Sequence, residues 1–124
     1  MKYEAGQVVL VKYLSFTKEV VNGLFLILYC ENADISTSNR KNYTVVKLTT
    51  QLVDTTYTVK ISNKYNTFLD KNCYASCSVI QTFNDDQIIR ELGKIDKNTL
   101  MKVYRSYRGF QFELERQFLD AMEQ

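Results

Sequence analysis

The sequence predicts an α+β fold, mainly β, in which a partly closed antiparallel barrel of about five strands is followed by C-terminal helices. Two observations predict it. The first two thirds of the chain contain short segments rich in β-branched and aromatic residues, separated by polar turns. After residue 84 the apolar residues recur at helical spacing instead. Strands first and helices last are typical of α+β domains, and five strands in so short a chain favour a bent sheet.

Five segments have the composition of strands. They are residues 7–14, 24–30, 43–49, 56–62 and 74–82. The second segment, LFLILYC, is apolar on both faces, which is typical of a central strand buried on both sides. The fourth, TYTVKIS, alternates apolar and polar side chains, which is typical of a strand with one face exposed.

Helix signals begin at Asn84, which can act as an N-cap residue. Gln87 stands at the third helical position, as in a capping box, and Phe83 with Ile88 would form a hydrophobic staple. We expect this helix to end at Gly93, because glycine commonly follows a helix C-terminus.

A second helix is predicted from Asp96, which can cap its first turn. Its apolar side would contain Leu100, Met101, Tyr104 and Tyr107. We expect Gly109 to break it before a last segment with further apolar residues.

The composition is typical of one soluble globular domain. Of the 124 residues, 45% are hydrophobic and 24% are charged, and no repeat or linker divides them. We therefore expect a single domain spanning residues 1–124. The longest apolar run, residues 24–30, is too short to cross a bilayer, and the opening MKYEAGQ lacks the apolar core of a signal peptide. These observations predict a cytoplasmic protein that does not contact membranes.

Three cysteines and no histidine argue against a metal centre. Cys73 and Cys77 are the only close pair, and two thiols without a further ligand nearby do not complete a zinc site. An odd number of separated cysteines is not a disulfide framework, so buried free thiols are expected. The net charge of +2 does not by itself identify a partner. We expect no metal and no cofactor.

Several stretches of the sequence occur in the order found in a known protein family. They are AGQVVLVKY, LFLILYCEN, VVKLTT, YTVKI with FLDKNCY, and SVIQTFNDDQIIRELGKIDKNTLMKVY. Together they cover about residues 5–108 and resemble the PemK/MazF-like family, the toxins of bacterial toxin–antitoxin pairs. The last stretch is the most specific, because in the family an Ile-x-Thr strand end leads to a helix, a glycine and a second helix.

The resemblance implies an SH3-like barrel that forms a homodimer and cleaves single-stranded RNA across the dimer face. It also implies an antitoxin protein whose flexible tail occupies that face. The family cleaves RNA by transesterification without histidine. It relies on an arginine, usually followed by proline, at the start of the second strand, and on the threonine or serine that closes the third.

Only part of this catalytic pattern is present. Thr49 in VVKLTT matches the hydroxyl position. The arginine position falls on Asn22 or Gly23, neither of which carries a positive charge, and Val79 replaces a glutamine that is frequent in the fifth strand. Lys47, Lys18 and Arg40 are candidates for the missing charge. Lys47 shares a face with Thr49, because the two residues are two apart on a strand. The alternative is that Lys47 and Thr49 are ordinary sheet residues.

Further polar residues are candidates for contact with RNA or a partner protein. They are Lys18 in the first loop, Arg40 at the end of the second loop, Gln51, and the row Lys102, Arg105 and Arg108. The row has helical spacing, so it could follow a phosphate backbone while Tyr104 and Tyr107 stack on bases. The alternative is a solvated helix face with its tyrosines packed inward.

Two functions of different classes are compatible with these observations. The first is an RNA-cleaving endoribonuclease of a type II toxin–antitoxin pair. The second is a catalytically inactive binding module, such as a phage or mobile-element protein that binds RNA or blocks a host protein, and the missing arginine favours it. A third possibility is a chance match on an unrelated small barrel.

Overall fold

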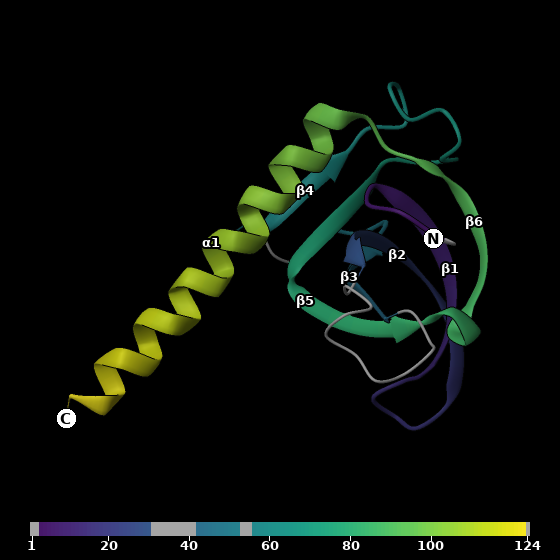
Figure 1. Cartoon of the computed structure of the whole chain (residues 1–124). Helices are drawn as coiled ribbons and strands as arrows, with labels where there is room; N and C mark the ends of the chain where they lie inside the picture. Colours follow the sequence, from purple (N-terminus) through teal and green to yellow (C-terminus); the bar gives the residue numbers. More distant parts are fainter. Residues whose placement is uncertain (1–2, 31–41, 53–55, 124) are drawn as a thin grey trace.

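The computed structural model describes residues 3–30, 42–52 and 56–123, which contain one antiparallel sheet followed by a long helix (Figure 1). The strands are β1 (Gln7–Leu14), β2 (Val20–Cys30), β3 (Asn42–Thr49), β4 (Thr58–Ile61), β5 (Cys73–Asn84) and β6 (Ile88–Lys94). Their order in the sheet is β4-β5-β3-β2-β1-β6. The predicted mainly β, α+β fold is confirmed, with six strands rather than five.

The sheet is strongly bent but does not close into a complete barrel. β4 and β6 are its two edges, and they do not pair with each other. Within the sheet, the pairing of β3 with β5 shifts between Val46, which faces Ile80, and Lys47, which faces Ser76. Such an irregularity bends the longer strand locally. Figure 1 shows β5 curving around the inner strands at this side of the molecule.

Alternate residues of the inner strands belong to two apolar clusters on opposite faces of the sheet. The Leu26 cluster includes Val8, Leu26, Leu28, Val46, Leu48, Ile61 and Leu69, with Val103 and Tyr107 from the C-terminal helix. The Phe25 cluster includes Val9, Val11, Phe25, Ile27, Tyr43, Val45, Phe83 and Ile88. The strand predicted at residues 24–30 is therefore central and buried on both sides, as expected, although β2 begins four residues earlier.

The helix predicted after Asn84 is wrong, although its capping box is real. The Asn84 Oδ1 accepts a hydrogen bond from the Asp86 N–H at 3.0 Å, and the Asn84 N–H donates to the Gln87 Oε1 at 3.1 Å. This cap begins only one 3₁₀ turn, η1 (Asp85–Gln87), and the chain then enters β6. Ile88 is buried in the Phe25 cluster, and β6 pairs with the free edge of β1. Pairing with a distant strand thus outweighs the local helix signal.

Gly93 lies inside β6 and does not end a helix. The ring of Phe68 packs directly on it, so a side chain at residue 93 would overlap the ring atoms. Glycine is required here because two segments approach closely.

One helix, α1 (Lys97–Met122), replaces the two helical segments predicted around Gly109. Its predicted cap is confirmed, since the Asp96 Oδ2 accepts a hydrogen bond from the Thr99 N–H at 3.0 Å. Gly109 is exposed within the helix, where glycine costs only about 1 kcal/mol and need not end it.

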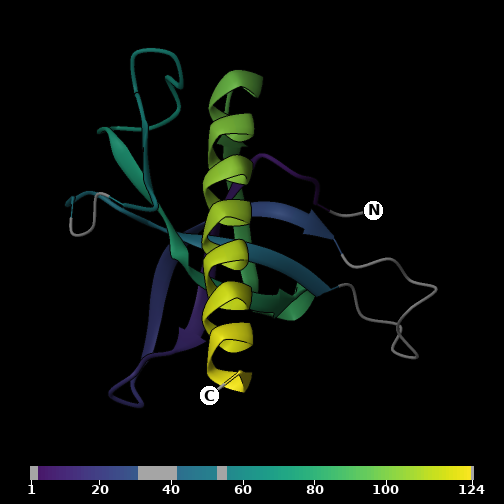
Figure 2. The same ribbon diagram turned by 90° about the vertical axis from the view of Figure 1, so that its left-hand side faces the viewer.

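The first half of α1 packs on the sheet and the second half extends away from it (Figure 1), and Figure 2 shows the helix crossing in front of the strands. Val103 and Tyr107 are its buried residues, and most of its contacts with the sheet are with β4 and β5. Nowhere in the described residues is there a helix long and apolar enough to cross a membrane.

Candidate functional site

Thr49 is the last residue of β3, and its side chain is half-buried rather than enclosed in a core cluster. Its Oγ1 accepts a hydrogen bond from the Gln51 N–H at 3.2 Å, so the hydroxyl is held at the point where the chain leaves the strand. Gln51 itself is exposed. A threonine at this position can donate its hydroxyl proton to a bound group, because the bond to Gln51 uses only an oxygen lone pair.

Two adjoining cavities lie beside Thr49. The first has a volume of about 270 Å³ and is lined by Leu24, Leu48, Thr49, Thr50 and Cys73. The second has a volume of about 250 Å³ and shares Leu24, Thr50 and Cys73 with the first. Its other walls come from residues 68–71 and from Leu92 of β6. Thr49 therefore borders a hollow whose other walls include members of the Leu26 cluster, and Lys47 does not line it.

Lys47 stands two residues before Thr49 on β3, so the two side chains leave the same face of the strand. The Lys47 Nζ donates a hydrogen bond to the Tyr13 hydroxyl at 3.4 Å and lies 5.9 Å from the centre of the Tyr13 ring. Tyr13 belongs to β1, two strands away in the sheet. Tyr13 therefore lies beside Lys47, on the face of β3 that Lys47 shares with Thr49.

Gly23, the position expected to carry the arginine, is covered by the same tyrosine. A Cβ built on Gly23 would stand 2.9 Å from the Tyr13 Cε1, 3.3 Å from the Phe25 Cε2 and 3.4 Å from the Tyr13 hydroxyl. The phenol oxygen is thus close both to this point and to the Lys47 Nζ. Phe25, which follows Gly23 by two residues, pairs directly with Lys47. Lys47 on β3 therefore carries a positive charge near the position on β2 where the family has its arginine.

The alternative alignment places the arginine at Asn22, on the opposite face of β2. Asn22 is exposed and pairs with Lys12 of β1. That face carries the Leu26 cluster further along the strand, whereas Lys47 and Thr49 are associated with the other face. Only the alignment on Gly23 therefore places the arginine position on the same face of the sheet as Thr49.

Aromatic side chains fix the position of Tyr13. Its ring meets Phe25 edge-on, with centroids 5.3 Å apart, and lies 5.9 Å from Phe83. Phe25 and Phe83 also meet edge-on at 5.0 Å. Because these contacts hold the ring from two sides, the phenol oxygen has a defined position. No sequence pattern indicates this role for Tyr13, because it depends on the register between β1 and β2.

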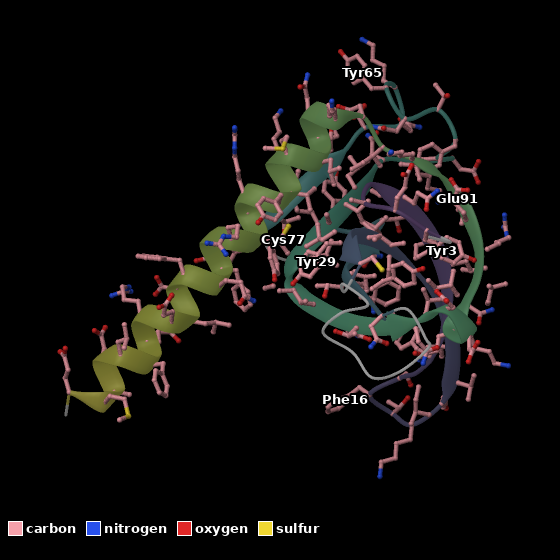
Figure 3. All side chains as sticks on the ribbon, in the orientation of Figure 1. Tyr3, Phe16, Tyr29, Tyr65, Cys77 and Glu91 are labelled. Carbon is pink, nitrogen blue, oxygen red and sulfur yellow. The ribbon has the colours of Figure 1, made fainter. Side chains whose placement is uncertain are left out.

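Lys18 occupies the tight turn between β1 and β2. Its φ of 67° is left-handed, and its N–H donates to the Ser15 carbonyl at 2.9 Å. The Lys18 side chain is exposed, as is that of Phe16, which Figure 3 shows at the tip of this hairpin. Arg40 falls outside the described residues.

The basic row on α1 is exposed but is separate from β3. Lys102, Arg105 and Arg108 are all solvent-exposed, and α1 packs on β4 and β5. Tyr107 is buried, and its hydroxyl forms a 3.0 Å hydrogen bond with that of Tyr29. The inward packing considered as the alternative therefore applies to Tyr107, whereas Tyr104 is 41% exposed.

The donor groups present do not form a metal centre in the part of the chain that the structure describes. No group of three or more His, Cys, Asp or Glu side chains there could hold an ion. Cys73 and Cys77 are buried free thiols, and burial raises the pKa of both, which favours the neutral form.

Solved structures resemble the whole chain, although no protein-family model and no curated protein matches it. An endoribonuclease from a mycobacterial species, solved with its cognate antitoxin, superposes with a TM-score of 0.67 at 20% identity, covering 88% of this chain and 94% of that one. The Mycobacterium tuberculosis toxin MazF-mt6 gives 0.62 at 17% identity, covering 84% and 94%. A MazE–MazF structure from Deinococcus radiodurans gives 0.64 at 10% identity, covering 88% and 94%.

These likenesses extend over nearly the full length of each toxin chain, and they agree with the order of the sequence stretches described above. At such low identities they establish the arrangement of strands and helix. The chain therefore has the PemK/MazF-like fold.

Proposed function

We propose that this protein is an RNA-cleaving toxin of a type II toxin–antitoxin pair, with Thr49 and Lys47 in its active site. The observation that carries the proposal concerns the Tyr13 hydroxyl, which lies 3.4 Å from the Lys47 Nζ and 3.4 Å from the Cβ position of Gly23, where the family has its arginine. Lys47 is on β3, the strand that ends in Thr49. A positive charge and a hydroxyl donor thus leave the same face of one strand.

The proposed reaction is an internal transesterification of single-stranded RNA. The 2′-oxygen attacks the adjacent phosphorus while the bond to the 5′-oxygen breaks, which leaves a 2′,3′-cyclic phosphate and a 5′-hydroxyl. The 2′-hydroxyl loses its proton to water and the leaving oxygen gains one from water. Negative charge increases on the non-bridging oxygens in the transition state, and this charge is what Lys47 and the hydroxyl of Thr49 would stabilise.

The remaining partners follow from the same proposal. An antitoxin protein is the expected partner, because the similar structures include an endoribonuclease with its cognate antitoxin and a MazE–MazF complex. A homodimer acting in the cytoplasm is expected by analogy with the toxin family. Lys18, Arg40 and Gln51 are proposed to contact RNA or the antitoxin near the site, and the Lys102, Arg105 and Arg108 row to contact them along α1.

Cleavage of a labelled single-stranded RNA library by the purified chain tests the proposal. We expect Thr49→Ala and Lys47→Met each to lower the cleavage rate about 100-fold or more, the usual effect of removing one transition-state donor. Lys64→Met is the matched control, because the Lys64 ammonium also lies over a tyrosine ring, 5.8 Å from the centre of Tyr65. If the folded wild-type chain leaves the whole library intact, the catalytic proposal is wrong.

The second candidate is the binding module without catalysis. It is favoured by one observation: Tyr13 fills the space at Gly23, so no arginine can be accommodated there without displacing the ring. Fluorescence anisotropy with the same RNAs separates the two candidates. Binding without cleavage would support an RNA-binding module, and neither binding nor cleavage would leave a host protein as the target.

A further inference from the structure

The Tyr13 ring is held in one place by the side chains that surround it. Phe25 and Phe83 contact it from the Phe25 cluster, and Gly23 leaves the space in which it lies. The ring is half-buried, and its hydroxyl is directed to the Lys47 Nζ at 3.4 Å. A fixed aromatic body with a polar tip can orient a mobile neighbour.

Lys47 needs such an orienting group if it is to bind a phosphate. A lysine side chain has four rotatable carbon–carbon bonds and loses considerable freedom when its ammonium is fixed. The Tyr13 hydroxyl, 3.4 Å from the Lys47 Nζ, accepts one of its three N–H bonds. Two N–H groups then remain for phosphate oxygens.

We propose that Tyr13 is a positioning residue, which holds the Lys47 ammonium at its hydroxyl so that the ammonium can neutralise the phosphodiester next to Thr49. This inference rests on the proposed function and assigns a role within the same site. It also explains why glycine is suitable at residue 23: any side chain there would displace Tyr13 and release Lys47.

A double-mutant cycle tests whether Tyr13 acts through Lys47. The variants are Tyr13→Phe, Lys47→Met and the double variant, assayed for RNA cleavage and for binding of the same RNA with a 2′-deoxy group at the cleavage position. Tyr13→Phe keeps the ring contacts with Phe25 and Phe83 and removes only the hydroxyl. Tyr65→Phe is the control, because Tyr65 is paired with Lys64 on an exposed loop.

We expect Tyr13→Phe to lower the cleavage rate about tenfold, the effect of losing one hydrogen bond to a charged group. The same substitution should have no further effect when Lys47 is already methionine, because the group that it positions is then absent. Gly23→Ala should resemble Tyr13→Phe, since its methyl group would stand 2.9 Å from the Tyr13 Cε1. A purely structural role would not produce this dependence on Lys47.

Separate outcomes overturn the two proposals. If the effects of Tyr13→Phe and Lys47→Met multiply in the double variant, or if Tyr13→Phe cleaves at the wild-type rate, Tyr13 does not position Lys47. If the wild type binds the 2′-deoxy RNA but cleaves nothing, the catalytic function fails. The double-mutant cycle is then measured on the affinity for the 2′-deoxy RNA. Independent or dependent effects of Tyr13→Phe and Lys47→Met on that affinity still decide whether Tyr13 positions Lys47.

Discussion

The buried side chain of Asn66 and the N-cap residue of α1, Asp96, exchange two hydrogen bonds. The Asp96 N–H donates to the Asn66 Oδ1 at 2.9 Å, and the Asn66 Nδ2 donates to the Asp96 Oδ1 at 3.1 Å. The Asn66 Nδ2 also donates to the Ser62 carbonyl at 2.9 Å. Asn66 belongs to the loop whose residues 68–71 line the cavity next to Thr50. The two hydrogen bonds therefore connect this loop to the start of the helix.

Replacing Asn66 by alanine is expected to destabilise the protein by about 1–3 kcal/mol, because buried polar groups then lose their partners. The free energy of unfolding, measured in urea, checks this. Lys64→Ala in the same loop is the control and should change stability by no more than about 0.5 kcal/mol, since its side chain is exposed. An Asn66→Ala variant as stable as the control would show that the pair contributes nothing.

Stability at low pH should depend on Asp96. Hydrogen bonds from the side chain and backbone of Thr99, with a further one from Asn66, lower the pKa of the Asp96 carboxyl. A carboxyl with a lowered pKa in the folded state stabilises the protein above its unfolded pKa of about 4, and this stability is lost as the pH falls through the folded value. Asp96→Asn retains a capping oxygen but does not titrate.

We therefore expect the urea midpoint of Asp96→Asn to fall less steeply than that of the wild type between about pH 5 and pH 2. Asp96→Ala should lose about 1 kcal/mol at pH 7, because it removes the cap itself. Parallel pH profiles for the wild type and Asp96→Asn would mean that Asp96 does not titrate differently in the folded and unfolded chains.

Tyr107 should make stability fall at high pH. Burial, together with the hydrogen bond to Tyr29, raises the pKa of Tyr107 to about 12. The unfolded chain releases this proton near pH 10. Stability from Tyr107 is therefore complete below about pH 10 and is lost as the pH rises towards 12.

Phenolate absorbance during an alkaline titration measures this directly. Tyr107→Phe should remove a late-titrating tyrosine, because the pKa of Tyr107 is raised to about 12. A Tyr107→Phe variant that loses absorbance in the early part of the titration instead would contradict the assignment.

Two glycines should respond to alanine with opposite signs. Gly93→Ala places a methyl group within the Phe68 ring, so we expect a loss of about 1–3 kcal/mol from overpacking. Gly109→Ala meets only the Tyr57 Cε1, at 3.7 Å, and should gain about 0.5–1 kcal/mol because alanine favours a helix. Urea unfolding of both variants measures the difference. A stabilised Gly93→Ala variant would mean that the ring moves away at little cost.

The strands could be predicted because their pattern reflects burial directly. The run at residues 24–30 is apolar on both faces, and β2 lies between two clusters. The shared face of Lys47 and Thr49 likewise follows from the period of a strand. These features depend only on neighbours in the sequence.

Features that depend on distant segments could not be predicted in this way. The capping box at Asn84 is present, but the residues that follow its 3₁₀ turn pair with the edge of β1 and form β6. Gly93 resembles a helix end in the sequence, and its actual reason, the Phe68 ring, lies 25 residues earlier in the chain. Tyr13 covers Gly23 only because β1 and β2 pair in one particular register.

The extension of α1 beyond the sheet has a practical consequence for studies of assembly. At 1.5 Å per residue its 26 residues form a rod about 39 Å long, of which only the first half packs on the sheet. An elongated particle elutes earlier from a gel-filtration column than a sphere of equal mass. Stoichiometry therefore needs light scattering or sedimentation equilibrium, because elution volume alone would overstate the mass of a single chain.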